Sequence, residues 1–280
     1  MSTVSPERPH LQLAVAIVSA LGLGVGGLFF GFVLLSLTVV LIGALTGASL
    51  SNFEFLVLSL VFVQGIGCAG VALAYYKLRP VVSPSIRSLL DLSGESQPFG
   101  IPASVPGLRD TVVIVGGYVA AFVGVFLGSA LITLVQTATG SNLDTGTNQA
   151  AEIGMENPEA LLVLIPASIL VIGPGEELLF RGVVQGRLRE FLGPVPGILL
   201  ASVVFAAPHW FALSGGSPTG NLAALSILAA VAVVVGTAYE YTENIVVPSL
   251  IHGFYNATLF GMLYLVVAYG DQLPQQGLLV

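Results

Sequence analysis

Seven long apolar segments are the feature that most restricts how this chain can fold. A helix needs about 20 predominantly apolar residues to cross a bilayer. Inside the hydrocarbon region its backbone polar groups must be satisfied within the segment, which an α-helix achieves. The sequence therefore predicts an all-α, polytopic transmembrane helix bundle with seven spans. The segments are residues 12–47, 52–76, 111–135, 158–186, 196–213, 221–239 and 245–269.

The composition excludes the soluble alternatives. Of the 280 residues, 55% are hydrophobic and only 8% are charged, whereas a soluble domain carries roughly 25% charged residues. So few charges cannot keep the surface of a soluble enzyme wetted. The net charge of −7, from 15 acidic and 8 basic residues, disfavours nucleic acid as a partner. We therefore expect a lipid bilayer around the protein and no nucleic acid.

The first apolar segment has an unusual length. It extends from Leu11 to Ala48, far beyond the 7–15 apolar residues of a signal peptide. We expect it to remain as a membrane anchor. One tilted span and two short spans around "GLGVGG" are both compatible with this length, and the second choice would give eight spans in total.

The basic residues indicate the orientation in the membrane. With one first span and a cytoplasmic N-terminus, every Lys and Arg falls in or beside a cytoplasmic segment, as the positive-inside rule requires. The opposite loops, 136–157 and 214–220, contain no basic residue. We therefore expect a multi-pass protein of the cell membrane with its N-terminus in the cytoplasm. The basic residues are Arg8, Lys77, Arg79, Arg87, Arg109, Arg181, Arg187 and Arg189.

The cytoplasmic loop at 77–110 contains "SPSIRSLLDLS", in which Ile86, Leu89 and Leu90 share one helical face. A short helix on the inner membrane surface and an ordered loop are equally compatible with it.

Ionisable residues inside the expected spans are the candidates for function, because they are costly in hydrocarbon and usually functional. Glu177 with Arg181, and His252 with Asn256, are four residues apart and share a helix face. Glu177 and Arg181 are also compatible with a buried ion pair that only fixes helix packing. The candidates are Glu176, Glu177, Arg181, His209 and His252, together with the polar Asn256.

Helix geometry places these candidates at a similar depth. A rise of 1.5 Å per residue from the expected cytoplasmic ends puts Glu176, His209, His252 and Asn256 roughly 12–20 Å into the membrane. Three spans would thus meet around one cavity that opens towards the cytoplasm. The "GPG" at 173–175 fits a helix bend at this point, although Gly and Pro are frequent in membrane helices in any case.

Three motifs together resemble those of a known family. "EELLFRG" at 176–182, "FAAPHW" at 205–210 and "HGFYNA" at 252–257 are similar to the EExxxR, FxxxH and HxxxN motifs of the CPBP intramembrane proteases. This family contains the type II CAAX prenyl endopeptidases and bacteriocin-processing relatives. We expect residues 1–150 to form N-terminal helices with an inner-face loop, 151–270 a catalytic core, and 271–280 a short tail.

The resemblance implies a role for each motif residue. Glu176 would act as the general base that activates water, and His209 would help to hold that water. Neutral His252 and Asn256 would hydrogen-bond the developing oxyanion, while Glu177 and Arg181 would support the site. The expected function is intramembrane hydrolysis of a peptide bond in a membrane-associated substrate, which a prenyl group would anchor if it is of the CAAX type.

Two questions stay open at this level. Glu176, His209 and His252 are suitable ligands for a catalytic zinc ion, although no HExxH helix is present, and the resemblance favours a glutamate mechanism that requires no cofactor over a metalloprotease. The alternative functions are an ion-coupled transporter, in which buried Glu and His relay ions, and a non-catalytic scaffold or immunity protein. Against a transporter, no pair of broken helices in matching halves is visible.

Overall fold

The computed structural model describes residues 9–90 and 99–270, and within them the chain is an all-α bundle. Arg8 and the expected tail at 271–280 lie outside these residues. Seven helical stretches of the described chain are long and apolar enough to cross a membrane, which confirms the predicted fold class. They are His10–Thr46, Asn52–Leu89, Leu108–Thr139, Pro158–Arg189, Pro194–Ala212, Pro218–Thr242 and Val246–Tyr269.

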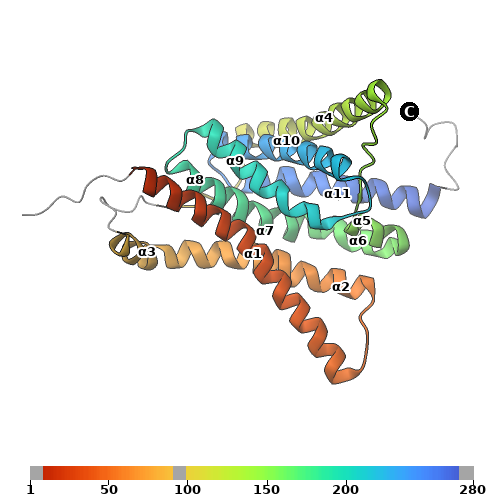
Figure 1. Ribbon diagram of the computed structural model, residues 1–280, viewed down its shortest axis with the longest axis horizontal. Coiled ribbons are helices and arrows are strands. Elements are labelled where there is room, and N and C mark those ends of the chain that lie inside the picture. Colours follow the sequence, from red (N-terminus) through yellow and green to blue (C-terminus); the bar gives the residue numbers. More distant parts are fainter. Residues whose placement is uncertain (1–8, 91–98, 271–280) are drawn as a thin grey trace, which may run out of the picture.

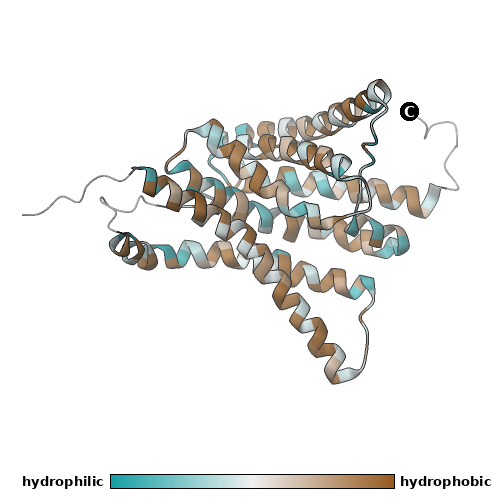
Figure 2. Cartoon of the chain, viewed as in Figure 1, coloured by the Kyte–Doolittle hydropathy of each residue, from teal (hydrophilic) through white to brown (hydrophobic). Residues whose placement is uncertain are grey.

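The first apolar segment forms a single helix, α1 (Pro9–Thr46), so residues 9–90 and 99–270 contain seven candidate spans and not eight. In Figure 1 α1 crosses the bundle obliquely, and its second half diverges from the other helices. Large side chains there, such as Phe29 and Phe32, are exposed. The residues of this half are mostly coloured as hydrophobic in Figure 2, as a lipid-facing helix requires.

The second stretch is one continuous helical path made of α2 (Asn52–Ser59), η1 (Leu60–Gly70) and α3 (Val71–Leu89). It begins with a capping box, in which the Ser51 hydroxyl accepts from the Glu54 amide and the Glu54 carboxylate accepts from the Ser51 amide. The helix continues through the described part of "SPSIRSLLDLS", so that part is helical as an extension of the span. Pro80 and Pro84 lie inside α3, and its last turns are seen nearly end-on in Figure 1, as expected of a proline bend.

Of the remaining spans, the third, sixth and seventh are single helices, and the fourth and fifth are assembled from shorter elements. The fourth span alone contains five helical segments, and the candidate residues of two motifs lie at or near junctions between such segments. The elements are α4 (Leu108–Thr139), β1 (Thr147–Asn148), α5 (Gln149–Glu156), α6 (Pro158–Ala167), η2 (Ser168–Ile172), α7 (Gly173–Glu177), η3 (Leu178–Gln185), α8 (Gly186–Arg189), α9 (Pro194–Ala206), η4 (Ala207–Ala212), β2 (Leu213–Ser214), α10 (Pro218–Thr242) and α11 (Val246–Tyr269).

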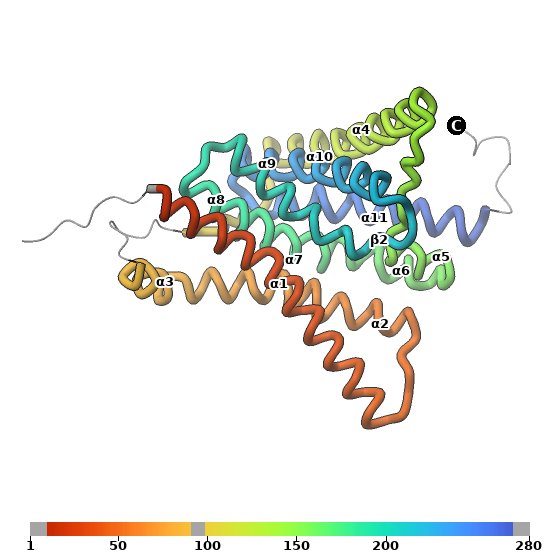
Figure 3. The backbone as a smooth tube through the Cα atoms, viewed as in Figure 1, coloured from red at the N-terminus to blue at the C-terminus, as the bar shows by residue number. Residues whose placement is uncertain are grey.

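The two loops without basic residues meet at one end of the bundle. β1 and β2 pair antiparallel, with Thr147 opposite Ser214, and the trace in Figure 3 descends from α4 to this pair. The Asn221 side chain accepts from the Gly146 amide at 2.7 Å and donates to the Gly215 carbonyl at 3.0 Å. Through these two hydrogen bonds the Asn221 side chain holds both loops together at this end of the bundle.

Arginines gather with glutamates at the opposite end. Arg79 pairs with Glu190 at 2.5 Å and Arg189 with Glu240 at 2.8 Å, while Arg187 also pairs with Glu190. These arginines and the two loops that contain no Lys or Arg therefore lie at opposite ends of the bundle. The expected orientation in the membrane depends on this separation.

The largest buried cluster joins both halves of the sequence. Ala20 of α1 and Cys68 of η1 pack with Leu179, Phe180 and Ala201 from the fourth and fifth spans. Cys68 is a free thiol buried in this cluster. The N-terminal helices thus form part of the packing that supports the motif-bearing helices.

Labelling of single cysteines tests this topology. In a Cys68→Ala background, Thr145→Cys lies in the loop before β1 and Val105→Cys in the segment before α4, and both positions are exposed. We expect a membrane-impermeant maleimide added to intact cells to label Thr145→Cys at once, and Val105→Cys only after permeabilisation. Labelling of both positions from the same side, or in the reverse order, would contradict the topology.

Candidate active site

The fourth span is helical throughout but changes its winding twice near the acidic motif. The π-helical segments η2 and η3 flank α7, which contains Gly173 to Glu177. Pro166 and Pro174 lack the amide hydrogen that an α-helix uses, and wide π-turns of this kind are frequent at functional sites. The chain therefore passes through "GPG" as a helix with altered winding.

The two glycines of "GPG" allow two other helices to approach. A Cβ on Gly173 would lie 2.7 Å from the Ser249 carbonyl oxygen of α11, and a Cβ on Gly175 would lie 2.7 Å from the Gln64 carbonyl oxygen of η1. Only glycine fits at such distances. Close packing on both sides brings α11, which carries His252, and η1, which carries Gln64, against the glutamate pair.

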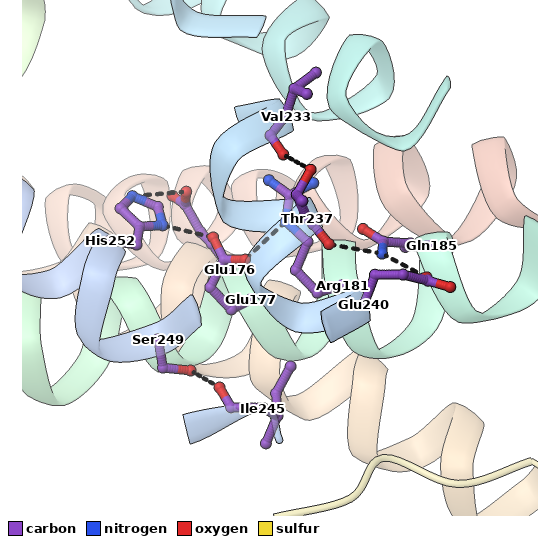
Figure 4. A network of polar contacts seen from close by, with 11 residues as sticks. Glu176, Glu177, Arg181, Gln185, Val233, Thr237, Glu240, Ile245, Ser249 and His252 are labelled. Atoms are coloured by element: carbon purple, nitrogen blue, oxygen red, sulfur yellow. Dashed lines mark hydrogen bonds and ion pairs between the residues drawn. The ribbon is translucent and has the colours of Figure 1, made fainter. Parts of the chain in front are cut away.

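Glu177 is the most completely enclosed carboxylate of the site. Its Oε2 accepts from Arg181 Nε at 2.8 Å, and its Oε1 accepts from His252 Nδ1 at 2.7 Å (Figure 4). Glu177 and Arg181 are both 0% exposed. Opposite charge and hydrogen bonds offset the cost of burying this carboxylate. The hydrogen bond from His252 to Glu177 also connects α11 to the fourth span.

Glu176 is held differently. Its Oε1 accepts from Gln64 Nε2 at 2.8 Å, while its Oε2 lies 3.8 Å from His252 Nε2. This second distance is too long for a direct hydrogen bond. One carboxylate oxygen of Glu176 is thus fixed by a neutral amide, and the other faces an imidazole nitrogen across a gap that one water molecule could bridge.

The contacts of His252 define its tautomer. An ionised carboxylate accepts hydrogen bonds but cannot donate them. The Nδ1 atom of His252 must therefore carry the proton that points at Glu177. In the neutral ring Nε2 then carries a lone pair, which is directed to the side of Glu176. Glu177 therefore fixes the orientation of the ring as well as its protonation pattern.

His209 joins the site through Phe205. Its Nδ1 donates to the Phe205 carbonyl oxygen at 2.9 Å, which leaves Nε2 as an acceptor in the neutral ring. The Phe205 ring lies 4.9 Å from the His209 ring and 5.8 Å from the His252 ring, measured between centroids. The Arg181 guanidinium lies 5.3 Å from the same ring. Phe205 is therefore in contact with both imidazoles and with the guanidinium group, contacts that only the fold reveals.

Asn256 lies one turn beyond His252 on α11 and is half-buried. Its side chain makes no hydrogen bond to the described residues. The structure thus brings Glu176, Glu177, Arg181 and His252 into one contact network and His209 to its edge, but it does not connect Asn256 to them.

Gln64 is a contact of Glu176 that sequence reasoning missed. The amide of Gln64 does not ionise, so the cost of burying a charge in hydrocarbon does not mark it as a candidate. The signal was nevertheless visible, because Gln64 is a lone polar side chain within the apolar run "LVFVQGIGCAG".

The zinc-ligand set considered from the sequence finds no support. In residues 9–90 and 99–270, no group of three or more His, Cys, Asp and Glu side chains is arranged to hold a metal ion. His252 Nδ1 is bonded to Glu177 and His209 Nδ1 to a carbonyl, which leaves the Nε2 atom of each ring as the nitrogen available for other contacts. Glu176, His209 and His252 are thus not gathered as a metal-binding group in the described residues, and the use of zinc stays a prediction.

Replacement of Arg181 tests the buried pair. Arg181→Met leaves the Glu177 carboxylate without its cation, so we expect a loss of about 3–5 kcal/mol in unfolding free energy. The matched control is Arg189→Met. Arg189 and Glu240 are partly exposed, so the control should lose less than about 1 kcal/mol. Thermal unfolding of both variants in detergent measures the difference, and equal losses would contradict the buried pair.

The comparisons with known proteins agree with this site. Residues 158–258 match the sequence model of the family described as type II CAAX prenyl endopeptidase Rce1-like, and this region contains all three motifs. No curated protein and no solved structure matches the chain. The resemblance predicted from the motifs is thereby confirmed: over residues 158–258 this membrane protein is similar to the Rce1-like type II CAAX prenyl endopeptidases.

Proposed function

We propose that the protein is an intramembrane endopeptidase that hydrolyses a peptide bond near the prenylated C-terminus of a membrane-associated substrate. A CAAX substrate carries its prenyl group on the cysteine of a C-terminal C-a-a-X sequence, and the enzyme would release the residues that follow this cysteine. The observation that supports the proposal most strongly is the Glu176 carboxylate, with one oxygen bonded to Gln64 and the other facing His252.

Glu176 acts as the general base in this proposal. A water molecule held at Glu176 Oε2 gives a proton to the carboxylate while its oxygen attacks the scissile carbonyl carbon. The protonated Glu176 then delivers that proton to the leaving nitrogen as the C–N bond breaks. His209 Nε2, an acceptor in the neutral ring, orients the same water from η4.

The negative charge that develops on the carbonyl oxygen needs hydrogen-bond donors. Because Nδ1–H of His252 is bonded to Glu177, Nε2 can donate only when the ring is an imidazolium. A buried carboxylate on Nδ1 stabilises that cation, as in an Asp–His pair. We therefore propose His252 as a cationic oxyanion donor in place of the neutral one expected from the sequence. Asn256 would supply a neutral donor after the substrate binds.

The substrate approaches from the cytoplasmic side in this proposal. The arginine-rich end of the bundle would face the cytoplasm by the positive-inside rule, with the N-terminus on the same side. A prenylated peptide anchored in the inner leaflet would then reach Glu176 from that side.

An isosteric pair of glutamate variants tests the proposed base. Glu176→Gln retains the shape of the side chain but cannot accept a proton, so we expect the rate of cleavage of a farnesylated CAAX peptide to fall by about 10²–10⁴-fold. The control, Glu240→Gln, changes a glutamate that pairs with Arg189 and should retain a rate close to wild type. In cells, new C-termini should disappear from the proteome with Glu176→Gln. Cleavage by this variant at the wild-type rate would exclude the proposed role.

Metal removal tests the mechanism separately. Because the site acts through a carboxylate and imidazoles, we expect purified protein treated with 1,10-phenanthroline and then dialysed to retain its rate of peptide cleavage. Metal analysis of the same sample should find no stoichiometric zinc. A rate that is lost after this treatment and restored by added zinc would show that a metal mechanism operates.

A further inference from the structure

We propose that Gln64 is a positioning residue for Glu176, holding the carboxylate so that its second oxygen faces the attacking water. This inference depends on the function proposed above and extends it to a residue outside the three motifs and outside the matched region. Gln64 precedes Glu176 by 112 positions and donates from Nε2 to Glu176 Oε1 at 2.8 Å.

The backbone of η1 is fixed where Gln64 projects. The Gln64 carbonyl oxygen lies against Gly175, at 2.7 Å from the place of a Cβ, and the Cβ of Cys68, one turn later, lies 3.7 Å from the same place. Cys68 is itself buried in the main core cluster. The amide is therefore presented to Glu176 from a rigid, closely packed helix, as a positioning group requires.

The orientation of the amide follows from the chemistry of its partner. An ionised carboxylate only accepts hydrogen bonds, so the NH₂ group of Gln64 must point at Glu176. The opposite orientation would place two acceptors together. Gln64 Oε1 is buried and has no hydrogen-bond partner among the described residues. The side chain thus donates a hydrogen bond to Glu176 while its own oxygen accepts none.

A neutral donor suits Glu176 because the two adjacent glutamates have different tasks. Glu177 is paired with the Arg181 cation and bonded to His252, which occupies both of its oxygens. An amide on Glu176 fixes one oxygen without neutralising the charge of the base, whereas Lys or Arg at position 64 would form an ion pair with it. Neighbouring carboxylates in different environments are the usual way to separate a base from a supporting group.

Steady-state kinetics of Gln64→Met test the inference. Met has a similar length but no donor, so Glu176 is free to rotate away from the water. We expect kcat for a farnesylated CAAX peptide to fall about 10–100-fold, the scale expected of a misplaced catalytic group, with KM within about twofold. The matched control is Gln185→Met. Gln185 is also a buried glutamine with an unpartnered oxygen, but it donates to the Gly236 carbonyl at 3.1 Å, so its kcat should stay within about threefold of wild type.

Gln64→Glu provides a second variant with the shape of glutamine. An ionised carboxylate cannot donate to Glu176 and repels it, so kcat should fall at least as far as in Gln64→Met. This variant also decides the question if Gln64→Met does not fold. A wild-type kcat in either folded variant would overturn the inference, as would an equal loss in Gln185→Met.

A double-mutant cycle on stability tests the contact without catalysis. Gln64→Met and Glu176→Met each leave one partner unsatisfied, so the melting temperature of the double variant should fall by less than the sum of the two single shifts. Additive shifts would overturn the contact. If Glu176→Gln cleaves normally, the proposed function fails while the cycle still reports on the contact. If Glu176→Gln is inactive and Gln64→Met is fully active, the inference about Gln64 fails alone.

Discussion

The buried carboxylate of Glu177 is the constraint on which the site depends. It accepts from Arg181 within its own helical path and from His252 of α11, so the last span is oriented by the fourth. A charge buried in this way is tolerable only when both its oxygens are satisfied, and the two bonds achieve this. Because the second bond fixes Nδ1–H of His252, it also decides which nitrogen faces Glu176. The hydrogen bonds of Glu177 therefore both stabilise the buried carboxylate and determine which nitrogen of His252 carries the proton.

Close helix packing gives Glu176 its surroundings. Gly173 admits α11 on one side and Gly175 admits η1 on the other, and each approaching helix carries a side chain to Glu176. The apolar core behind them contains residues from both halves of the chain, so the N-terminal spans contribute directly to the geometry of the site. In a bilayer, where lipid is as apolar as the helix surface, such close contacts between small residues are a principal source of helix association.

Much of this arrangement could be predicted from the sequence. The spans could be recognised because a long uninterrupted apolar run is able to cross a bilayer as a helix. The motif residues could be grouped because helix geometry gives their depth in the membrane and the helix face that they share. Gln64 could not be assigned, because its partner is far away in the sequence and only helix packing brings the two together. The contacts of Phe205 with two imidazoles and the tautomer of His252 likewise depend on the tertiary fold. Residue types alone likewise do not decide whether Glu176, His209 and His252 can hold a metal ion, because that depends on where their Nε2 and carboxylate atoms lie.

The central claim is that water, activated by Glu176, attacks the scissile carbonyl directly. Single-turnover cleavage of a CAAX peptide by excess enzyme in H₂¹⁸O, followed by mass spectrometry, tests it most directly. The account predicts that the new C-terminal carboxylate of the product gains one solvent oxygen and that the Glu176 side chain gains none. Solvent oxygen found in Glu176, with an unlabelled product, would show a covalent acyl intermediate on this residue and contradict the account.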